Sequence, residues 1–171
     1  MTYSCPIWFG KINITNEKEL KVMKYEIVNL DEKLVVGISA RTNNSSPDMS
    51  NIITGLWTSF FKDGIYDSIK NKINHKTLGV YTEYENNENG DYTVMVGCEV
   101  SCEPKELNCV KIPAGKYAKF IAKGDVHLAV AEVWQEVWKM NLNRSFVCDF
   151  EEYQNEDMKN AEIHIYIGLK E

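Results

Sequence analysis

The chain has 171 residues, of which 44% are hydrophobic and 26% charged, and its formal net charge is -6. This size fits one well-buried globular domain, and the acidic balance with scattered Lys and Arg argues against direct binding of a nucleic acid. No run approaches the roughly 20 apolar residues of a membrane span, and no signal peptide is recognisable, so we expect a cytoplasmic protein that does not contact membranes.

The chain begins with an extension over residues 1–22, which the pattern of the remaining sequence does not cover. Residues 25–28 and 34–38 then have the composition of two strands. The acidic pair Asp31 and Glu32 lies between them. This arrangement favours a hairpin that turns at the acidic pair.

A helix is predicted after the polar break that ends with Pro47 and Asp48. Apolar side chains recur there at helical spacing, at Met49, Ile53, Leu56 and Phe60. Two strands follow near residues 78–84 and 92–100, and a polar stretch with a turn signal joins them. The first half therefore predicts two strands, one helix and two further strands.

The second half, from about Gly115, repeats this order from the second strand onward: one strand, one helix and two further strands. A strand over residues 117–122 leads to Asp125, which is suited to cap the start of a helix. That helix has an apolar stripe at Val126, Val130, Val133 and Val137. A last pair of strands is predicted near 147–153 and 162–169.

The two predicted helices match position by position, which indicates a duplicated unit. Met49, Ile53, Leu56, Trp57, Phe60 and Phe61 fall opposite Val126, Val130, Val133, Trp134, Val137 and Trp138. We predict an α+β fold of duplicated βαββ units with pseudo-two-fold symmetry, in which an antiparallel sheet carries the helices on one side and a central cleft takes a ligand. Repeat one spans about residues 23–102 and repeat two about 108–169, within a single domain of residues 23–171 that we expect to be monomeric.

Signatures of metal, cofactor and catalytic sites are missing from the sequence. The five cysteines have no CxxC spacing and the three histidines have no ligand spacing, so we expect reduced thiols, no metal and no cofactor. There is no GxSxG elbow, P-loop or dinucleotide GxGxxG motif. The extension is too short for a helix-turn-helix domain, so any role in transcription would act through a partner protein or by holding a ligand.

Several runs in the second half, taken together, resemble the GyrI-like effector-binding domain. They are Ile-Pro-Ala-Gly-Lys-Tyr at 112–117, the helix with Trp134 and Trp138, Asp-Phe-Glu-Glu-Tyr at 149–153, and Ile-His-Ile-Tyr-Ile at 163–167. That domain occurs fused to AraC-type and MerR-type transcription regulators and as stand-alone proteins, including integron-associated ones. The resemblance covers about residues 23–169. It implies a cleft for small amphipathic or cationic molecules, with a glutamate at its floor.

The acidic position of that family corresponds here to Glu151, and Tyr153 shares its strand face. A carboxylate partly shielded by aromatic rings can hold an organic cation by charge attraction and cation–π contact. This reading requires Phe150 to face the helix-covered core. The alternative is that Glu151 is an ordinary solvated strand residue.

The remaining candidates for the lining of the cleft come from both halves. Thr82 and Tyr84 match Glu151 and Tyr153 in the repeat, whereas alternation turns Tyr81 to the other face. The aromatic residues lie on the flank of each helix stripe, although core packing is the common role of such residues. The additional candidates are Trp57, Phe61, Trp134, Trp138, Thr82, Tyr84, Met95 and Tyr166.

Three classes of function remain open. We expect a small-molecule binding protein, linked to transcription regulation or to ligand sequestration, more than an enzyme. One alternative is a hydrolase in which Glu151 and Tyr153 activate a water molecule. The other is a gyrase-inhibitor-like module that contacts a regulatory protein partner.

Overall fold

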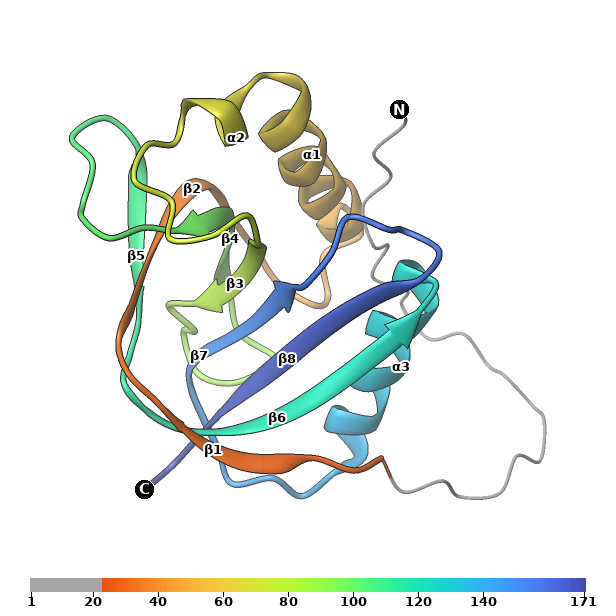
Figure 1. The fold of residues 1–171 in the computed structure, drawn as a ribbon. Coiled ribbons are helices and arrows are strands. Elements are labelled where there is room, and N and C mark those ends of the chain that lie inside the picture. The colour runs from red at the N-terminus through yellow and green to blue at the C-terminus, as the bar shows by residue number, and fades with distance from the viewer. Residues whose placement is uncertain (1–22) are drawn as a thin grey trace.

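The computed structural model describes residues 23–171 (Figure 1). The predictions for the extension, residues 1–22, lie outside this range. The strands are β1 (Glu26–Leu30), β2 (Lys33–Thr42), β3 (Thr77–Thr82), β4 (Tyr92–Glu99), β5 (Asn108–Ile112), β6 (Gly115–Gly124), β7 (Arg144–Tyr153) and β8 (Ala161–Leu169). The helices are α1 (Met49–Lys62), the short α2 (Ile65–Ser68) and α3 (Val126–Lys139).

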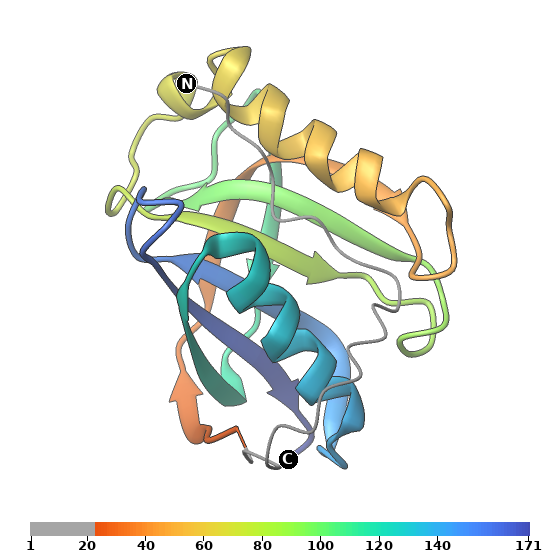
Figure 2. The same cartoon turned by 90° about the vertical axis from the view of Figure 1, so that its right-hand side faces the viewer.

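The described strands form one antiparallel sheet in the order β1-β6-β8-β7-β3-β4-β2-β5. Helices α1 and α3 lie on the same face of this sheet (Figure 2). The order reads alike from both ends, because β6, α3, β7 and β8 of the second half take the places of β2, α1, β3 and β4 of the first. The predicted α+β fold is therefore confirmed, with one βαββ unit on either side of the β3–β7 boundary.

The register between β3 and β7 and the contacts of the two tryptophans locate the centre of this symmetry. Gly79 pairs with Glu151. Trp57 meets Tyr153 edge to face at 4.9 Å between ring centroids, as Trp134 meets Tyr81 at 5.4 Å. A two-fold axis through the pair of Gly79 and Glu151 exchanges these two contacts, so Glu151 lies on the axis.

This symmetry corrects the predicted counterparts. Thr82 and Tyr84 are not the counterparts of Glu151 and Tyr153, because Gly79 takes the place of Glu151 and Tyr81 that of Tyr153. A shift by an odd number of residues moves every side chain of a strand to the opposite face. The predicted orientation of Tyr81 is wrong for this reason.

The predicted hairpin between the first two strands is also wrong. β1 pairs with β6, and β2 pairs with β5, so each of these edge strands crosses to the other half. The acidic pair at residues 31–32 links two strands that do not pair with each other. Val28 and Leu30 of β1 pack against the back of the sheet, and this burial across the halves decides the pairing of β1 over the local turn signal.

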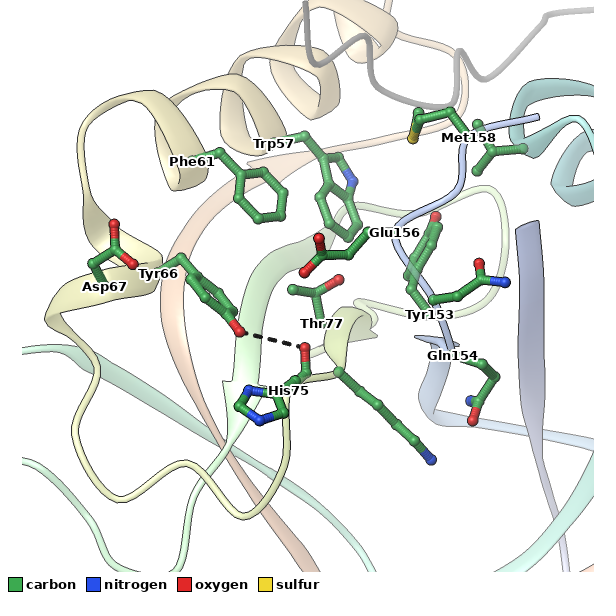
Figure 3. Close-up of a pocket in the computed structure, with 13 residues that line it drawn as sticks. Trp57, Phe61, Tyr66, Asp67, His75, Thr77, Tyr153, Gln154, Glu156 and Met158 are labelled. Atoms are coloured by element: carbon green, nitrogen blue, oxygen red, sulfur yellow. Dashed lines mark hydrogen bonds between the residues drawn. The ribbon is translucent and has the colours of Figure 1, made fainter. Parts of the chain in front are cut away.

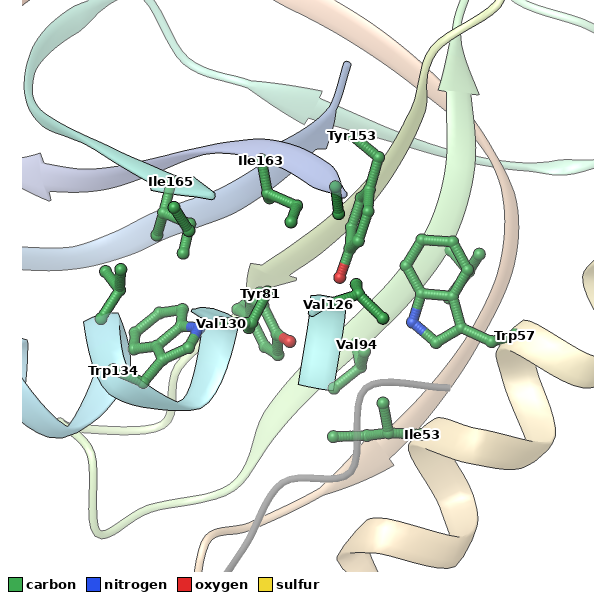
Figure 4. Close-up of a cluster of buried hydrophobic side chains, with 14 of the residues drawn as sticks. Ile53, Trp57, Tyr81, Val94, Val126, Val130, Trp134, Tyr153, Ile163 and Ile165 are labelled. Carbon is green, nitrogen blue, oxygen red and sulfur yellow. The ribbon is translucent and has the colours of Figure 1, made fainter. Parts of the chain in front are cut away.

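Each face of the sheet carries its own apolar core. The core under the helices includes Trp57, Trp134 and the isoleucines of β8, of which Figure 4 shows a part. The core on the opposite face consists of Val35, Leu78, Val80, Met95, Ile112, Tyr117, Cys148, Phe150 and Tyr166. Successive side chains of a strand point to opposite faces of the sheet, so alternate positions of each strand contribute to the two cores.

The two long helices place their tryptophans identically. Trp57 and Trp134 each lie eight residues after the first residue of a 14-residue helix. Asp125 caps α3 as predicted, since its side chain accepts hydrogen bonds from the backbone N–H groups of His127 and Leu128. Both indoles are buried in the core under the helices and do not lie on its flank.

Candidate functional site

Glu151 is a carboxylate buried in the core under the helices, with 1% of its surface exposed. Three side chains donate hydrogen bonds to it. Trp134 Nε1 and the Tyr81 hydroxyl donate to Oε1 over 2.7 and 3.1 Å, and the Tyr153 hydroxyl donates to Oε2 over 2.8 Å. The donors come from α3, β3 and β7, so the carboxylate joins both halves of the fold.

Burial is the main influence on the charge of Glu151 and raises its pKa above the ordinary value. The hydrogen bonds from Trp134, Tyr153 and Tyr81 act in the opposite direction, because they stabilise the ionised form. All three donors are uncharged, and within residues 23–171 no ion pair reaches Glu151. The site therefore holds a potential negative charge without a cationic partner in the described part of the chain.

Gly79 makes room for this carboxylate. It pairs with Glu151 across β3 and β7. A Cβ atom at Gly79 would lie 3.3 Å from Glu151 Oε2 and 3.5 Å from Trp57 Cζ2. The glycine thus lets the Trp57 ring of α1 approach the sheet beside the carboxylate, on the side opposite Trp134 (Figure 4).

Asp149, the other buried acid on this face of β7, has a different environment. Arg144 forms an ion pair with it at 2.7 Å, and the Tyr84 hydroxyl donates to the same oxygen over 2.6 Å. The backbone N–H of Gly168 donates to the other oxygen over 2.8 Å. A proline at position 168 could not make this bond, and a Cβ atom there would lie 2.5 Å from the Cys148 carbonyl oxygen, which accounts for the glycine. Asp149 thus has a cationic partner inside the fold, whereas Glu151 has none among the described residues.

A cavity of about 390 Å³ opens beside Glu151, between α1, α2 and the connection from β7 to β8 (Figure 3). Trp57 and Tyr153 form its inner wall and meet edge to face at 4.9 Å between ring centroids. The Tyr153 hydroxyl also donates to Glu151, so the carboxylate lies directly behind this wall. The cavity lining consists of Trp57, Phe61, Tyr66, Asp67, His75, Lys76, Thr77, Val126, Tyr153, Gln154, Asn155, Glu156 and Met158.

A second, much smaller hollow lies at the pseudo-symmetric end of α3. Trp134 and Trp138 line it, in place of Trp57 and Phe61. Its volume is about 10 Å³, which suffices for about one water molecule. Arg144, whose charge is paired with Asp149, and Glu88 also line it. This end therefore offers little space, whereas the end at α1 has a large cavity.

The predicted lining residues fall into three groups. Glu151, Tyr153, Trp134 and Trp57 lie together, and Phe61 lines the large cavity. Tyr84 and Trp138 line the small hollow. Thr82, Met95 and Tyr166 do not join either group.

Those three residues belong to the opposite face of the sheet. Met95 and Tyr166 are in the back core, where Tyr166 stacks on Phe150 at 4.4 Å between ring centroids. Thr82 pairs with Cys148 of the same core, and its hydroxyl donates to the Val147 carbonyl. Phe150 therefore does not face the helices, because the strand presents Glu151 and Tyr153 to them instead.

Sequence reasoning missed Tyr81 and Gly79 beside Glu151 and most of the cavity lining, including Tyr66 and Glu156. Tyr81 was placed on the wrong face by the predicted match of the halves, and Gly79 was not singled out. Tyr66 of α2 and Glu156 of the β7–β8 connection lie in short or irregular segments. Their approach to Trp57 depends on packing between distant segments, which no local spacing encodes.

Comparison with known proteins gives the family. Residues 26–169 match the family model described as Cass2, integron-associated effector binding protein. The chain belongs to this family. It is 30% identical over 154 residues to YobU of Bacillus subtilis (strain 168), which is named as a candidate transcriptional regulator, and the match covers 84% of this chain and 96% of YobU.

Two solved structures have a similar fold. The integron cassette protein VCH_CASS2 of Vibrio cholerae is 27% identical with a TM-score of 0.65, over 84% of this chain and 95% of the other. SAV2435, solved bound to tetraphenylphosphonium, is 20% identical with a TM-score of 0.73, over 86% and 94% of the two chains. At that identity the likeness to SAV2435 establishes the shared fold.

The described residues show two further properties of this family member. No helix within residues 23–171 is long and apolar enough to cross a membrane. The same part of the chain contains no group of three or more His, Cys, Asp or Glu side chains that could hold a metal ion.

Proposed function

We propose that this effector-binding protein takes amphipathic organic cations into the cavity beside Trp57 and Tyr153, and that Glu151 supplies the negative charge that selects them. The observation that carries this proposal is a completely buried carboxylate, held by three uncharged donors, directly behind an aromatic cavity wall. Burying a charge without a partner is costly, and an arriving cation reduces that cost.

The contrast with Asp149 supports a role in binding over a role in stability. An acid that only stabilises the fold is best served by a full set of partners, and Asp149 has an arginine, a phenol and a backbone N–H. Glu151 has hydrogen bonds but no countercharge among the described residues. Such a carboxylate destabilises the empty protein and becomes favourable when a cation provides the missing charge.

The aromatic lining supplies the second part of the recognition. Trp57, Phe61 and Tyr66 line the cavity, and cation–π contacts with such rings contribute about 0.5–2 kcal/mol each, depending on desolvation. Apolar groups of the ligand gain roughly 25 cal/mol for each Å² that they remove from water. Together these terms favour a ligand with a diffuse positive charge and an apolar body.

The relatives are consistent with this ligand class. Tetraphenylphosphonium, in the SAV2435 structure, is an organic cation with four apolar rings. YobU is named as a candidate transcriptional regulator, and this chain spans nearly all of it. We infer that binding of the cation serves regulation through a protein partner, or sequestration of the cation.

Two probes of nearly equal size and opposite charge test the proposal. Tetraphenylphosphonium and tetraphenylborate both carry four phenyl groups, so they separate the effect of charge from that of apolar contact. We expect the cation to bind with 1:1 stoichiometry in calorimetry and to quench tryptophan fluorescence, because Trp57 lines the cavity. Equal affinity for the anion would refute the role of Glu151.

A further inference from the structure

Glu156 is a second carboxylate of the cavity, at its mouth. It lies in the connection between β7 and β8, is exposed to solvent, and points into the cavity between Trp57 and Tyr66 (Figure 3). Within residues 23–171 it has no hydrogen bond or ion pair with another side chain. Its charge is therefore available to a ligand.

Aromatic rings flank this carboxylate. Trp57 and Phe61 lie nearly parallel, with 6.3 Å between ring centroids, and Phe61 and Tyr66 are 5.8 Å apart. A carboxylate beside several ring faces is the combination that recognises alkylammonium groups. The Lys72 ammonium already lies over the Tyr66 ring, 4.5 Å from its centroid, so this ring interacts with a cation in the protein itself.

The other charged groups at the mouth leave it negative. Asp67 of α2 lines the cavity beside Tyr66, and its charge and that of Glu156 help burial to raise the pKa of that phenol. Lys76 also lines the cavity, but Glu152 pairs with its ammonium at 3.0 Å. The carboxylates of Asp67 and Glu156 thus line the mouth, and the charge of Lys76 is balanced by Glu152. The Lys72 ammonium on the Tyr66 ring is the other cation near them.

We propose that Glu156, with Trp57 and Tyr66, forms a second cation subsite at the mouth, separate from the buried charge of Glu151, and that the preferred ligand is an elongated dication. This inference rests on the proposed function, since it divides the same cavity into an inner and an outer charge site. A ligand with a single charge can pair with only one of Glu151 and Glu156. A dication with an apolar linker satisfies both and places its linker against the rings.

Pairs of probes with one linker and different charge test this inference. Hexyltrimethylammonium and hexamethonium share a six-carbon chain, and decyltrimethylammonium and decamethonium share a ten-carbon chain. An added ion pair near the surface together with a cation–π contact corresponds to an affinity gain of about five- to tenfold. We expect at least one dication to bind tighter than its monocation by this factor at low ionic strength.

Two variants with the same change of net charge identify the source of the gain. Glu156→Gln should remove the advantage of the dication, to within about twofold, and leave the monocation nearly unchanged. Glu132→Gln, at an exposed position of α3, should preserve the advantage. Thermal unfolding of both variants should match the parent chain, because surface changes of this kind move stability little.

The outcomes separate the two proposals. If no cation binds the parent chain, the proposed function fails. If cations bind but the dications have no advantage, or if Glu132→Gln removes the advantage as well, the proposed function stands and the mouth subsite is refuted.

Discussion

Replacing Glu151 by Gln tests whether the buried carboxylate lowers the free energy of unfolding of the protein. The amide has nearly the same shape, and its oxygen can still accept from Trp134 and Tyr81. Its N–H₂ group can donate to the Tyr153 hydroxyl, which then acts as the acceptor. The substitution therefore removes the charge and leaves the buried polar groups paired.

The expected effect follows from the raised pKa of Glu151. The folded protein holds the proton more tightly than the unfolded chain, so the unfolded chain loses its proton first as pH rises. Stability is unaffected by this group below its ordinary pKa and falls as pH rises from there to the folded pKa, by about 1.4 kcal/mol for each unit between them. Glu151→Gln should lack this fall. It should be more stable than the parent chain by about 1–4 kcal/mol near neutral pH, as when buried ionic groups are replaced by neutral ones.

Denaturant unfolding at about pH 4 and about pH 7.5 measures this difference. Glu132→Gln serves as the control for the change in net charge, since it lies on the exposed face of α3. We expect the two stability curves to approach each other at the lower pH and to separate at the higher pH. A Glu151→Gln protein that is less stable than the parent near neutral pH would show that the charge itself holds the fold together, and would refute this reasoning.

Other substitutions test the surroundings of the site. Arg144→Met should cost about 3–5 kcal/mol in unfolding free energy, because it leaves Asp149 buried and charged without its ion pair; a loss below about 1 kcal/mol would contradict that role. Gly168→Ala should destabilise by more than about 2 kcal/mol, since its Cβ would lie 2.5 Å from the Cys148 carbonyl oxygen. Gly55→Ala, within α1, should instead stabilise by about 0.5–1 kcal/mol, because apart from the adjoining helix backbone no atom of residues 23–171 would lie within 4 Å of its Cβ. Equal changes in unfolding free energy for the two alanine variants would show that the close approach of position 168 to Cys148 does not limit stability.

The helices and most strands could be predicted because their signals are local. The stripe that begins at Met49 and the stripe that begins at Val126 each repeat at the period of a helix, and both helices were found with their tryptophans in register. The capping role of Asp125 was also visible, since it depends on a few neighbouring residues.

The pairing of the strands depended on contacts that the local sequence does not contain. The turn residues before β2 suggested a hairpin, yet β1 gains its partner from β6, far along the chain. The position of Tyr81 required the register between β3 and β7 to be known to one residue. Pattern matching alone could not fix it, because both faces of this sheet are apolar and either register buries hydrophobic side chains.

The candidate site was predicted in part. Glu151 and Tyr153 were singled out through the family resemblance, and the structure places them together with both buried tryptophans. The cavity itself could not be predicted, since α2 and the β7–β8 connection form much of its lining. A short helix and an irregular turn have no periodic signal that would place them beside α1.

The affinity of the Glu151→Gln protein for tetraphenylphosphonium tests the central claim most directly. If the carboxylate selects cations, calorimetry should show a loss of about 1–3 kcal/mol, which is roughly five- to 150-fold in Kd, while any weak binding of tetraphenylborate stays the same or improves. A hydrolase that uses this residue would instead keep its binding and lose turnover of an activated substrate. An unchanged affinity for the cation would contradict the account, because the charge of Glu151 would then have no part in recognition.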